Sequence, residues 1–221
     1  MSSILPFDEL NALSAEKNQR SMPIDRYFDE MVLTEQQKRD RKDFARELQE
    51  LLFVTMSMIH LLVVDGVSAV TLDTVKTNLT NDIDRLVRKF TYPDGYMVYI
   101  IGEYVSNFVD VTVRHSASDD PKDLAYWYSQ DRARLNAEDE ANDIFNYDEY
   151  RQAVFDGKTR KEWISMRDAH VRKTHAEVDG EVIPIEDTFL VGESLMRFPH
   201  DSSLGAGIEE LAGCRCSVRY F

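Results

Sequence analysis

Residues 157–185, GKTRKEWISMRDAHVRKTHAEVDGEVIPI, decide the fold class because the chain changes its character within them. Gly157 ends a region whose apolar residues recur at helical spacing, and from Thr159 onward turns are frequent and apolar runs are short. Helices followed by short strands predict an α+β protein with segregated layers. One further helix is predicted among the strands, at about 168–178. The runs predicted as strands are residues 163–164, 182–185, 189–191, 195–198 and 218–221.

Long amphipathic helices are predicted throughout the N-terminal half. The first begins at Thr34, because Thr34 and Gln37 have the spacing of a capping box, and Gly66 offers its end. A second helix follows at about residues 71–90, where apolar residues again recur every three or four positions.

A third helix is predicted at about 96–116, although the β-branched residues 111–113 leave a strand open for its end. A fourth helical segment covers about 122–156. Asn136 and Asn146 are two candidate positions for a break in it, and the sequence leaves that alternative open.

The sequence predicts three regions. Residues 1–33 have scattered apolar positions without a sustained period and are predicted to be an irregular arm with at most one short helix. The SASDDP loop at 116–121 is the predicted boundary between a helical domain at 34–120 and a small mixed α+β domain at 121–221.

The net charge bounds the partners that the chain can have. Forty acidic and 26 basic residues give −14 at pH 7. A surface of this sign repels phosphates, so direct DNA binding is disfavoured and docking on protein is favoured. The longest apolar run, residues 51–64, is too short to span a bilayer, and the N-terminus lacks the pattern of a signal peptide. Two cysteines and no export signal predict a reducing cytoplasm and no membrane.

The densest group of reactive side chains lies on the helix predicted at 168–178. On a continuous helix, Asp168, Arg172, His175 and Asp179 would form one stripe, with Thr174 beside it. Three interpretations are open. The stripe is a structural ladder of ion pairs, or a catalytic or anion-binding site with His175 as acid or base and Arg172 holding an oxyanion, or part of a metal site.

Cys214 and Cys216 are the only cysteines, and one residue separates them. On a strand, their side chains would share one face and Arg215 would point to the other. Extended geometry disfavours a disulfide between them. Two thiolates could bind zinc together with two further ligands, but one intervening residue is fewer than zinc pairs usually have. Two small buried residues on a closing strand are the favoured alternative.

The further zinc ligands, if that site exists, would come from the histidines near the end of the chain. The candidates are His175, His170, or His200 with Asp201. An unbroken helix at 168–178 would not let His170 and His175 bind the same ion, because they would lie on different faces.

An ordered series of residues resembles a known family. The pattern W-x4-D-x3-R-x2-H-x3-D-G is followed by a proline and then by CRC. This series resembles the C-terminal domain of phage head morphogenesis proteins, the Mu F-like minor head (minor capsid) family, over about 130–220. The family commonly has asparagine directly before CRC, where this chain has Gly213. The residues that carry the resemblance are Glu140, Asn142, Lys161, Glu162, Trp163, Asp168, Arg172, His175, Asp179, Gly180, Pro199, Cys214, Arg215 and Cys216.

The resemblance implies a minor structural protein of a tailed-phage capsid, acting in head morphogenesis or DNA delivery. It implies a place in the virion, in the capsid interior or at the portal vertex, after assembly in the host cytoplasm. The implied partners are the portal protein and the major capsid or scaffold protein. No cofactor is expected apart from the candidate zinc ion.

The resemblance also implies an alternative, a metal-independent RNase-like nuclease or toxin. Carried over to this chain, its candidate catalytic residues are His175 and Arg172, with Thr174, Asp168 and Asp179 beside them. No P-loop, dinucleotide-binding glycine motif, serine elbow or HExxH motif appears, so the common large enzyme classes have no support. The sequence favours the structural role.

Overall fold

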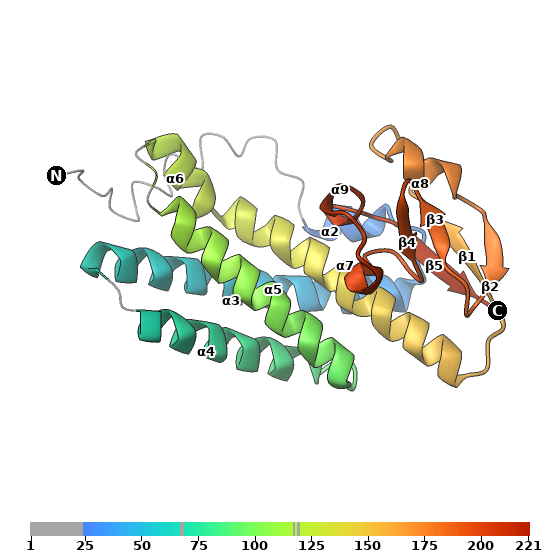
Figure 1. Ribbon diagram of the computed structural model, residues 1–221, viewed down its shortest axis with the longest axis horizontal. Helices are drawn as coiled ribbons and strands as arrows, with labels where there is room; N and C mark the ends of the chain where they lie inside the picture. Colours follow the sequence, from blue (N-terminus) through green and yellow to red (C-terminus); the bar gives the residue numbers. More distant parts are fainter. Residues whose placement is uncertain (1–23, 67–68, 117, 119) are drawn as a thin grey trace. The chain divides into compact units, whose positions relative to one another are not determined.

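The computed structural model describes residues 24–66, 69–116, 118 and 120–221. It confirms the α+β class, with a helical N-terminal half and short antiparallel strands near the C-terminus (Figure 1). The long helices are α3 Glu35–Asp65, α4 Ala69–Val87, α5 Gly95–His115 and α7 Gln130–Phe155, with the shorter α6 Pro121–Trp127 before α7.

The ends of the long helices follow local signals in the sequence. Gln37 donates its backbone N–H to the Thr34 hydroxyl, and the Thr34 N–H is bound by the Gln37 side chain at 2.8 Å, so the capping box is confirmed. Asp94 caps α5 by accepting the N–H of Met97 at 2.9 Å. Residues 111–113 lie inside α5, so the alternative of a strand there is wrong.

The break in the fourth helical segment lies at Tyr128 and Ser129, and not at Asn136 or Asn146. The Ser129 hydroxyl accepts the N–H of Arg132 at 3.0 Å, which starts α7. Asn136 instead returns a bond to the carbonyl of Arg132 within the helix, and Asn146 is used in tertiary contacts. Neither asparagine therefore interrupts the helix.

The chain forms two compact units. The helical unit comprises residues 43–137. In it, α4 packs on α5, α5 packs on α6, and the apolar stripes of the helices are buried. The predicted boundary at 120–121 differs from this division. The loop at 116–121 instead joins two helices of one unit, where the hydroxyls of Ser116 and Tyr128 are hydrogen-bonded.

The α+β unit comprises residues 24–42 and 138–221. It contains α2 Ile24–Asp29 and the ends of α3 and α7 that belong to these residues. Its sheet has the order β2–β1–β5 and is antiparallel, with β1 Arg160–Ile164 between β2 Val182–Pro184 and β5 Ser217–Tyr220. A hairpin of β3 Phe189–Val191 and β4 Ser194–Met196, the helices α8 Lys173–Glu177 and α9 Ile208–Leu211, and the 3-10 turn η2 Ser202–Leu204 complete it.

The short helix allowed for in the predicted arm at 1–33 is found as α2, but the described residues around it are packed and do not form an arm. Residues 1–23 lie outside the described residues. Residues 24–33 contain α2, whose Phe28 is fully buried, and Met31 just after it is 2% exposed. Tyr27 also reaches the C-terminal segment, donating its hydroxyl to the carbonyl of Cys214 at 3.4 Å. This part of the chain is therefore packed structure within the α+β unit.

The core of the α+β unit lies on the inner face of β1. Trp163 on β1 is fully buried and pairs in register with Val218 of β5. The Trp163 ring meets Phe189 edge to face at 5.2 Å and His175 at 5.7 Å. The sheet thus presents an aromatic surface to α8, which fixes where His175 lies. Among the described residues, no helix has both the length and the apolar character that crossing a membrane requires.

Candidate functional site

The helix predicted at 168–178 is much shorter than expected. The helix α8 begins only at Lys173, and Arg172 before it has extended backbone angles. Asp168 starts a tight turn instead, because its carboxylate accepts the N–H of His170 at 2.9 Å. Arg167 before the turn has a positive φ of 56°. A local side-chain cap therefore replaces the first turn of the helix that the periodicity predicted.

The predicted stripe is consequently not formed. Asp168 pairs with Arg215 at 2.8 Å, and Arg172 donates to the backbone carbonyl of Ala212. Asp179 accepts the backbone N–H of Ser165 at 2.8 Å and the Arg167 guanidinium at 2.7 Å. Asp168 and Arg172 thus hold the segment around the cysteines, Asp179 holds the segment around Ser165, and within the described residues none of the three side chains makes a hydrogen bond or ion pair with His175.

His175 is 1% exposed and is brought against the two cysteines. Its Nδ1 lies 3.4 Å from Sγ of Cys216 and 3.5 Å from Sγ of Cys214. Its Nε2 lies 3.0 Å from a carboxylate oxygen of Glu210. Since a carboxylate accepts hydrogen bonds, this contact places the ring proton on Nε2 and leaves the Nδ1 lone pair facing the thiols.

The cysteines lie in the segment 213–216 that precedes β5, which we call the cysteine turn, so their predicted place on the closing strand is wrong. Gly213 has a positive φ of 66°, a left-handed conformation that glycine adopts freely and asparagine tolerates, which accounts for the glycine at the position before CRC. The prediction that both thiols face one side and Arg215 the other is confirmed by their contacts with His175 and Asp168.

The arrangement of His175, Cys214 and Cys216 could hold a metal ion. Their three ligand atoms lie within 4.8 Å of one another, and all three residues are buried. A tetrahedral zinc ion with ordinary bond lengths sets its nitrogen and sulfur ligands about 3.6 Å apart. The two distances from Nδ1, 3.4 and 3.5 Å, agree with that geometry. We call these three residues the metal group.

Glu210 supports the metal group by a hydrogen bond to its histidine, His175. The carboxylate oxygen that faces His175 also accepts the hydroxyl of Thr174 at 2.8 Å, so it is fixed from two sides. Histidines that bind metals usually donate their other N–H to a carboxylate, which orients the ring. Of the predicted candidates, Thr174 thus acts through Glu210, and sequence reasoning missed Glu210 because α9 has only four residues.

A small cavity adjoins the metal group. Its volume is about 20 Å³, enough for one water-sized group. His170 and Arg172 line it from the turn before α8, and Cys214, Arg215 and Cys216 line it from the other side.

His200 lies outside the metal group, contrary to its place among the candidate zinc ligands. Its Nε2 donates to the backbone carbonyl of Cys214 at 2.7 Å and lies 3.7 Å from the Asp139 carboxylate. Burial alone would lower the pKa of His200, but Asp139 and the bond to Cys214 outweigh burial and raise this pKa to about 10. His200 is therefore a buried cation that holds the cysteine turn through its backbone. Asp201, offered as its companion ligand, is paired with Arg197 at 2.8 Å instead.

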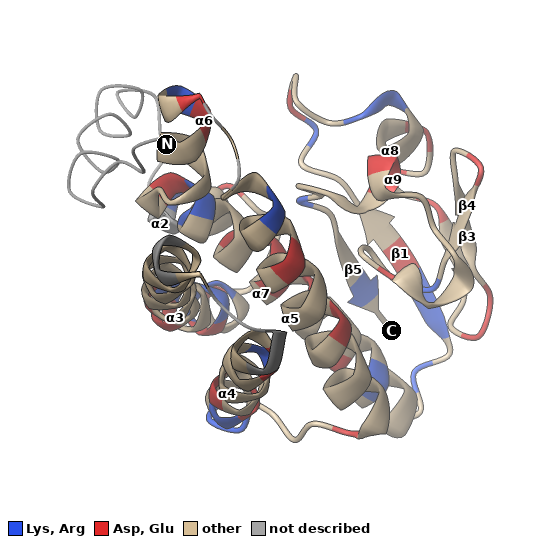
Figure 2. Ribbon diagram, turned by 60° about the vertical axis from the view of Figure 1, so that its left-hand side comes forward, with Lys and Arg blue, Asp and Glu red and all other residues tan. Residues whose placement is uncertain are grey.

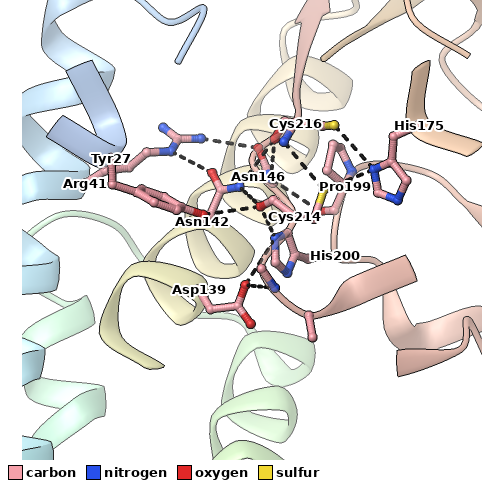
Figure 3. Close-up of polar contacts among 12 residues, drawn as sticks. Tyr27, Arg41, Asp139, Asn142, Asn146, His175, Pro199, His200, Cys214 and Cys216 are labelled. Atoms are coloured by element: carbon pink, nitrogen blue, oxygen red, sulfur yellow. Dashed lines mark hydrogen bonds and ion pairs between the residues drawn. The ribbon is translucent and has the colours of Figure 1, made fainter. Parts of the chain in front are cut away.

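Amide side chains of α7 also hold the cysteine turn (Figure 3). Asn142 donates to the carbonyls of Cys214 and Cys216 at 3.0 and 3.3 Å, and it accepts a bond from the buried Arg41 at 3.3 Å. Asn146 donates to the carbonyls of Pro199 and Cys216 at 3.3 and 3.4 Å. The sequence singled out Asn142 and Pro199 through the resemblance, but no local signal pointed to Arg41.

Burial also shifts the pKa of titratable groups near the cysteine turn. It raises the pKa of the Cys214 thiol to about 12, and the neighbouring Cys216 thiol adds to this rise. Acidic residues recur along α7 (Figure 2), and Asp139 among them accepts the N–H of Gly213 at 2.8 Å. Burial raises the pKa of Asp139, while His200 opposes the rise. The turn is thus set between a cation and an acidic helix.

No family model, no curated protein and no solved structure matches this chain.

Proposed function

We propose that this chain is a minor structural protein of a tailed-phage head, located at the portal vertex or inner shell, that acts in head morphogenesis or DNA delivery. The proposal starts from the ordered series of residues between Glu140 and Cys216 that resembles the Mu F-like minor head family. Its partners are the portal protein and the major capsid or scaffold protein. The net charge of −14 favours docking on protein over direct contact with DNA.

The observation that carries the proposal is that several residues of this series meet at the cysteine turn. Asn142 binds the backbone of both cysteines, Asp168 binds Arg215, and Arg172 binds Ala212. His175 contacts both thiols. Residues that are scattered over about 75 positions thus have a shared role, which is to fix the cysteine turn. A series with this role is what a structural domain requires.

The same contacts weigh against the RNase-like alternative. A general acid or base must reach the substrate, whereas His175 is 1% exposed and both of its ring nitrogens face groups of the protein. Arg172 and Asp168, which would stand beside it, are bound to Ala212 and Arg215. These residues are therefore better placed to hold the fold than to cut a nucleic acid.

We propose zinc as the ion of the metal group, with a structural role in this domain. Two thiolates and an imidazole are soft and borderline ligands that suit Zn²⁺, and magnesium or calcium would require oxygen ligands. The carboxylate of Glu210 on His175 supports a metal ligand at Nδ1. Zinc would then tie α8 to the turn before β5.

The head-protein proposal is tested in phage particles. Antibodies against the purified chain are used to probe procapsids and virions from a lysogen that encodes it, and the purified chain is tested for binding to portal and scaffold proteins. We expect a few copies per particle and binding to one of these proteins. Particles without the chain, together with nuclease activity that is lost in His175→Ala, would instead establish the RNase-like alternative.

The N-terminal segment gives a second test. Removing residues 1–33 should weaken binding to portal or scaffold protein if this segment reaches a neighbouring subunit. Since α2 packs within the α+β unit, removing only residues 1–23 is the matched variant that leaves Phe28 and Met31 in place. If both truncated chains bound portal or scaffold protein as the full chain does, residues 1–33 would be excluded from the interface.

A further inference from the structure

The metal group provides three ligands, whereas a structural zinc site needs four. Within the described residues, no fourth histidine, cysteine, aspartate or glutamate belongs to the group. Zinc with three protein ligands keeps a water at the fourth position and is the arrangement of catalytic sites. The identity of the fourth ligand therefore separates a structural from a catalytic centre.

The cavity beside the metal group marks where the fourth ligand would enter. It has room for about one water-sized group and adjoins all three ligands, since His175, Cys214 and Cys216 line it. Among its other lining residues, His170 is the one with an imidazole. Met166, Val171, Arg172, Gly213 and Arg215 complete the lining, and none of them is a usual zinc ligand.

The backbone around His170 allows His170 and His175 to bind the same ion, which an unbroken helix would not allow. On an unbroken helix, His170 and His175 would face different directions. Because α8 begins at Lys173, His170 lies in the preceding turn and its direction is independent of the helix. Its backbone N–H is fixed by Asp168, while its exposed ring receives no hydrogen bond from the described residues. No hydrogen bond within that part of the chain therefore holds the ring in its present position.

A salt bridge holds the turn of His170 against the cysteines. Asp168, two positions before His170, binds the guanidinium of Arg215, which is the residue between the two thiol ligands. Arg172, two positions after His170, donates to the carbonyl of Ala212 just before the cysteine turn. The segment that carries His170 is thus tied on both sides to the segment that carries Cys214 and Cys216.

We propose that the exposed ring of His170 turns towards the cavity, places one ring nitrogen there and closes the zinc site as its fourth ligand, giving two cysteines and two histidines around the ion. This inference rests on the proposed zinc ion and deepens it. Closure by His170 excludes a metal-bound water and makes the centre structural. It also turns the residues 168–172 into a loop whose conformation depends on the metal.

The test uses Co²⁺ in the full chain, because its spectrum reports both the thiolate ligands and the coordination number. The variants are His170→Ala and His170→Cys, and His115→Ala in the helical unit is the matched control. We expect wild type and control to bind one Co²⁺ per chain with intense four-coordinate bands and no spectral change between pH 6 and 9. His170→Ala should bind at least about tenfold more weakly, as observed when zinc sites lose supporting groups.

Two further signatures separate a ligand from a residue that only supports the loop. His170→Ala should keep the two-thiolate charge-transfer band. Its Co²⁺ spectrum should also shift with pH, with a midpoint of about 7, because a water bound at the fourth position then loses a proton. His170→Cys should restore tight binding with a stronger thiolate band. Equal affinity and equal spectra for wild type and His170→Ala would overturn the assignment of His170 and leave zinc in place. A wild-type chain that binds no Zn²⁺ or Co²⁺ would overturn both.

Discussion

Asp168 and Arg215 lie 47 positions apart in the sequence and are joined by a salt bridge in which one guanidinium nitrogen contacts both carboxylate oxygens, at 2.8 and 3.0 Å. Arg215 separates the two cysteines, so this pair connects the turn before α8 to the metal group. The CRC spacing places the two thiols on one side and the arginine on the side that meets Asp168.

The first prediction concerns the strength of this pair. Its side chains are 14% and 31% exposed, so solvent weakens the attraction. A double-mutant cycle with Asp168→Ala and Arg215→Ala should give a coupling free energy of up to about 1 kcal/mol in urea unfolding. The cycle for Lys173 and Glu177, a pair 90% and 61% exposed, is the control and should give less than half of that. Equal couplings for the two pairs would contradict the connecting role.

The second prediction concerns Glu210. Its replacement in Glu210→Gln removes the charge that orients His175, and the affinity for Zn²⁺ should fall by about 10- to 100-fold. Competition with a chromophoric chelator measures this affinity. Glu209→Gln is the control: it makes the same substitution at an exposed neighbouring residue and should leave the affinity for Zn²⁺ unchanged. If both variants bound zinc as wild type does, His175 would not be oriented by the carboxylate.

The third prediction concerns Asn142. Asn142→Asp keeps the acceptor for Arg41 but loses the donors to the carbonyls of Cys214 and Cys216. Since buried acceptors left without donors cost about 1–3 kcal/mol each, we expect the free energy of unfolding to fall by about 2 kcal/mol or more. Asn136→Asp, at a half-buried site with one local bond, is the comparison and should change stability far less. A similar loss for both would show that the carbonyls do not need Asn142.

The fourth prediction concerns the pH dependence that His200 imposes. Its pKa is about 10 in the folded protein and about 6.5 in an unfolded chain, so the folded state binds the proton more tightly. The stability that this proton provides is complete below pH about 6.5 and is lost as the pH rises towards 10. The facing carboxylates are Asp139 and Asp143 of α7. In chelator, the stability difference between wild type and His200→Gln should therefore shrink from pH 6.5 to 10. A difference independent of pH would mean that His200 is neutral in the fold.

The sequence predicted the elements whose ends are marked by nearby residues. Thr34 and Gln37 started α3, Gly66 followed its end, and the run at 189–191 became β3, because caps, glycines and apolar periods act over a few positions. The same reasoning failed at 168–172. There Asp168 used its carboxylate in a turn, and its ion-pair partner was Arg215 and not the neighbouring Arg172.

The candidate site was predicted in part for the same reason. His175, Cys214 and Cys216 were named from their residue types, but the exclusion of His200 depended on its contacts with Asp139 and the Cys214 carbonyl, and the position of His170 depended on where α8 begins. Glu210 and Arg41 contribute through contacts 35 and 101 positions away, on which periodicity carries no information. The compact units differ from the predicted domains because the α+β unit is discontinuous in sequence, and a change of composition along the chain cannot show that residues 24–42 belong with residues 138–221.

That discontinuity has a consequence for the order of folding. The bond between Arg41 and Asn142 closes a loop of 101 positions, and closing a flexible loop of this length opposes folding by about 4 kcal/mol. Within the helical unit, Gln49 and Gln130 already meet at 3.0 Å. A helical unit that folds first therefore brings the two distant parts of the chain together before the sheet forms. Substitutions that slow its folding would delay the assembly of the cysteine turn without touching any residue of it.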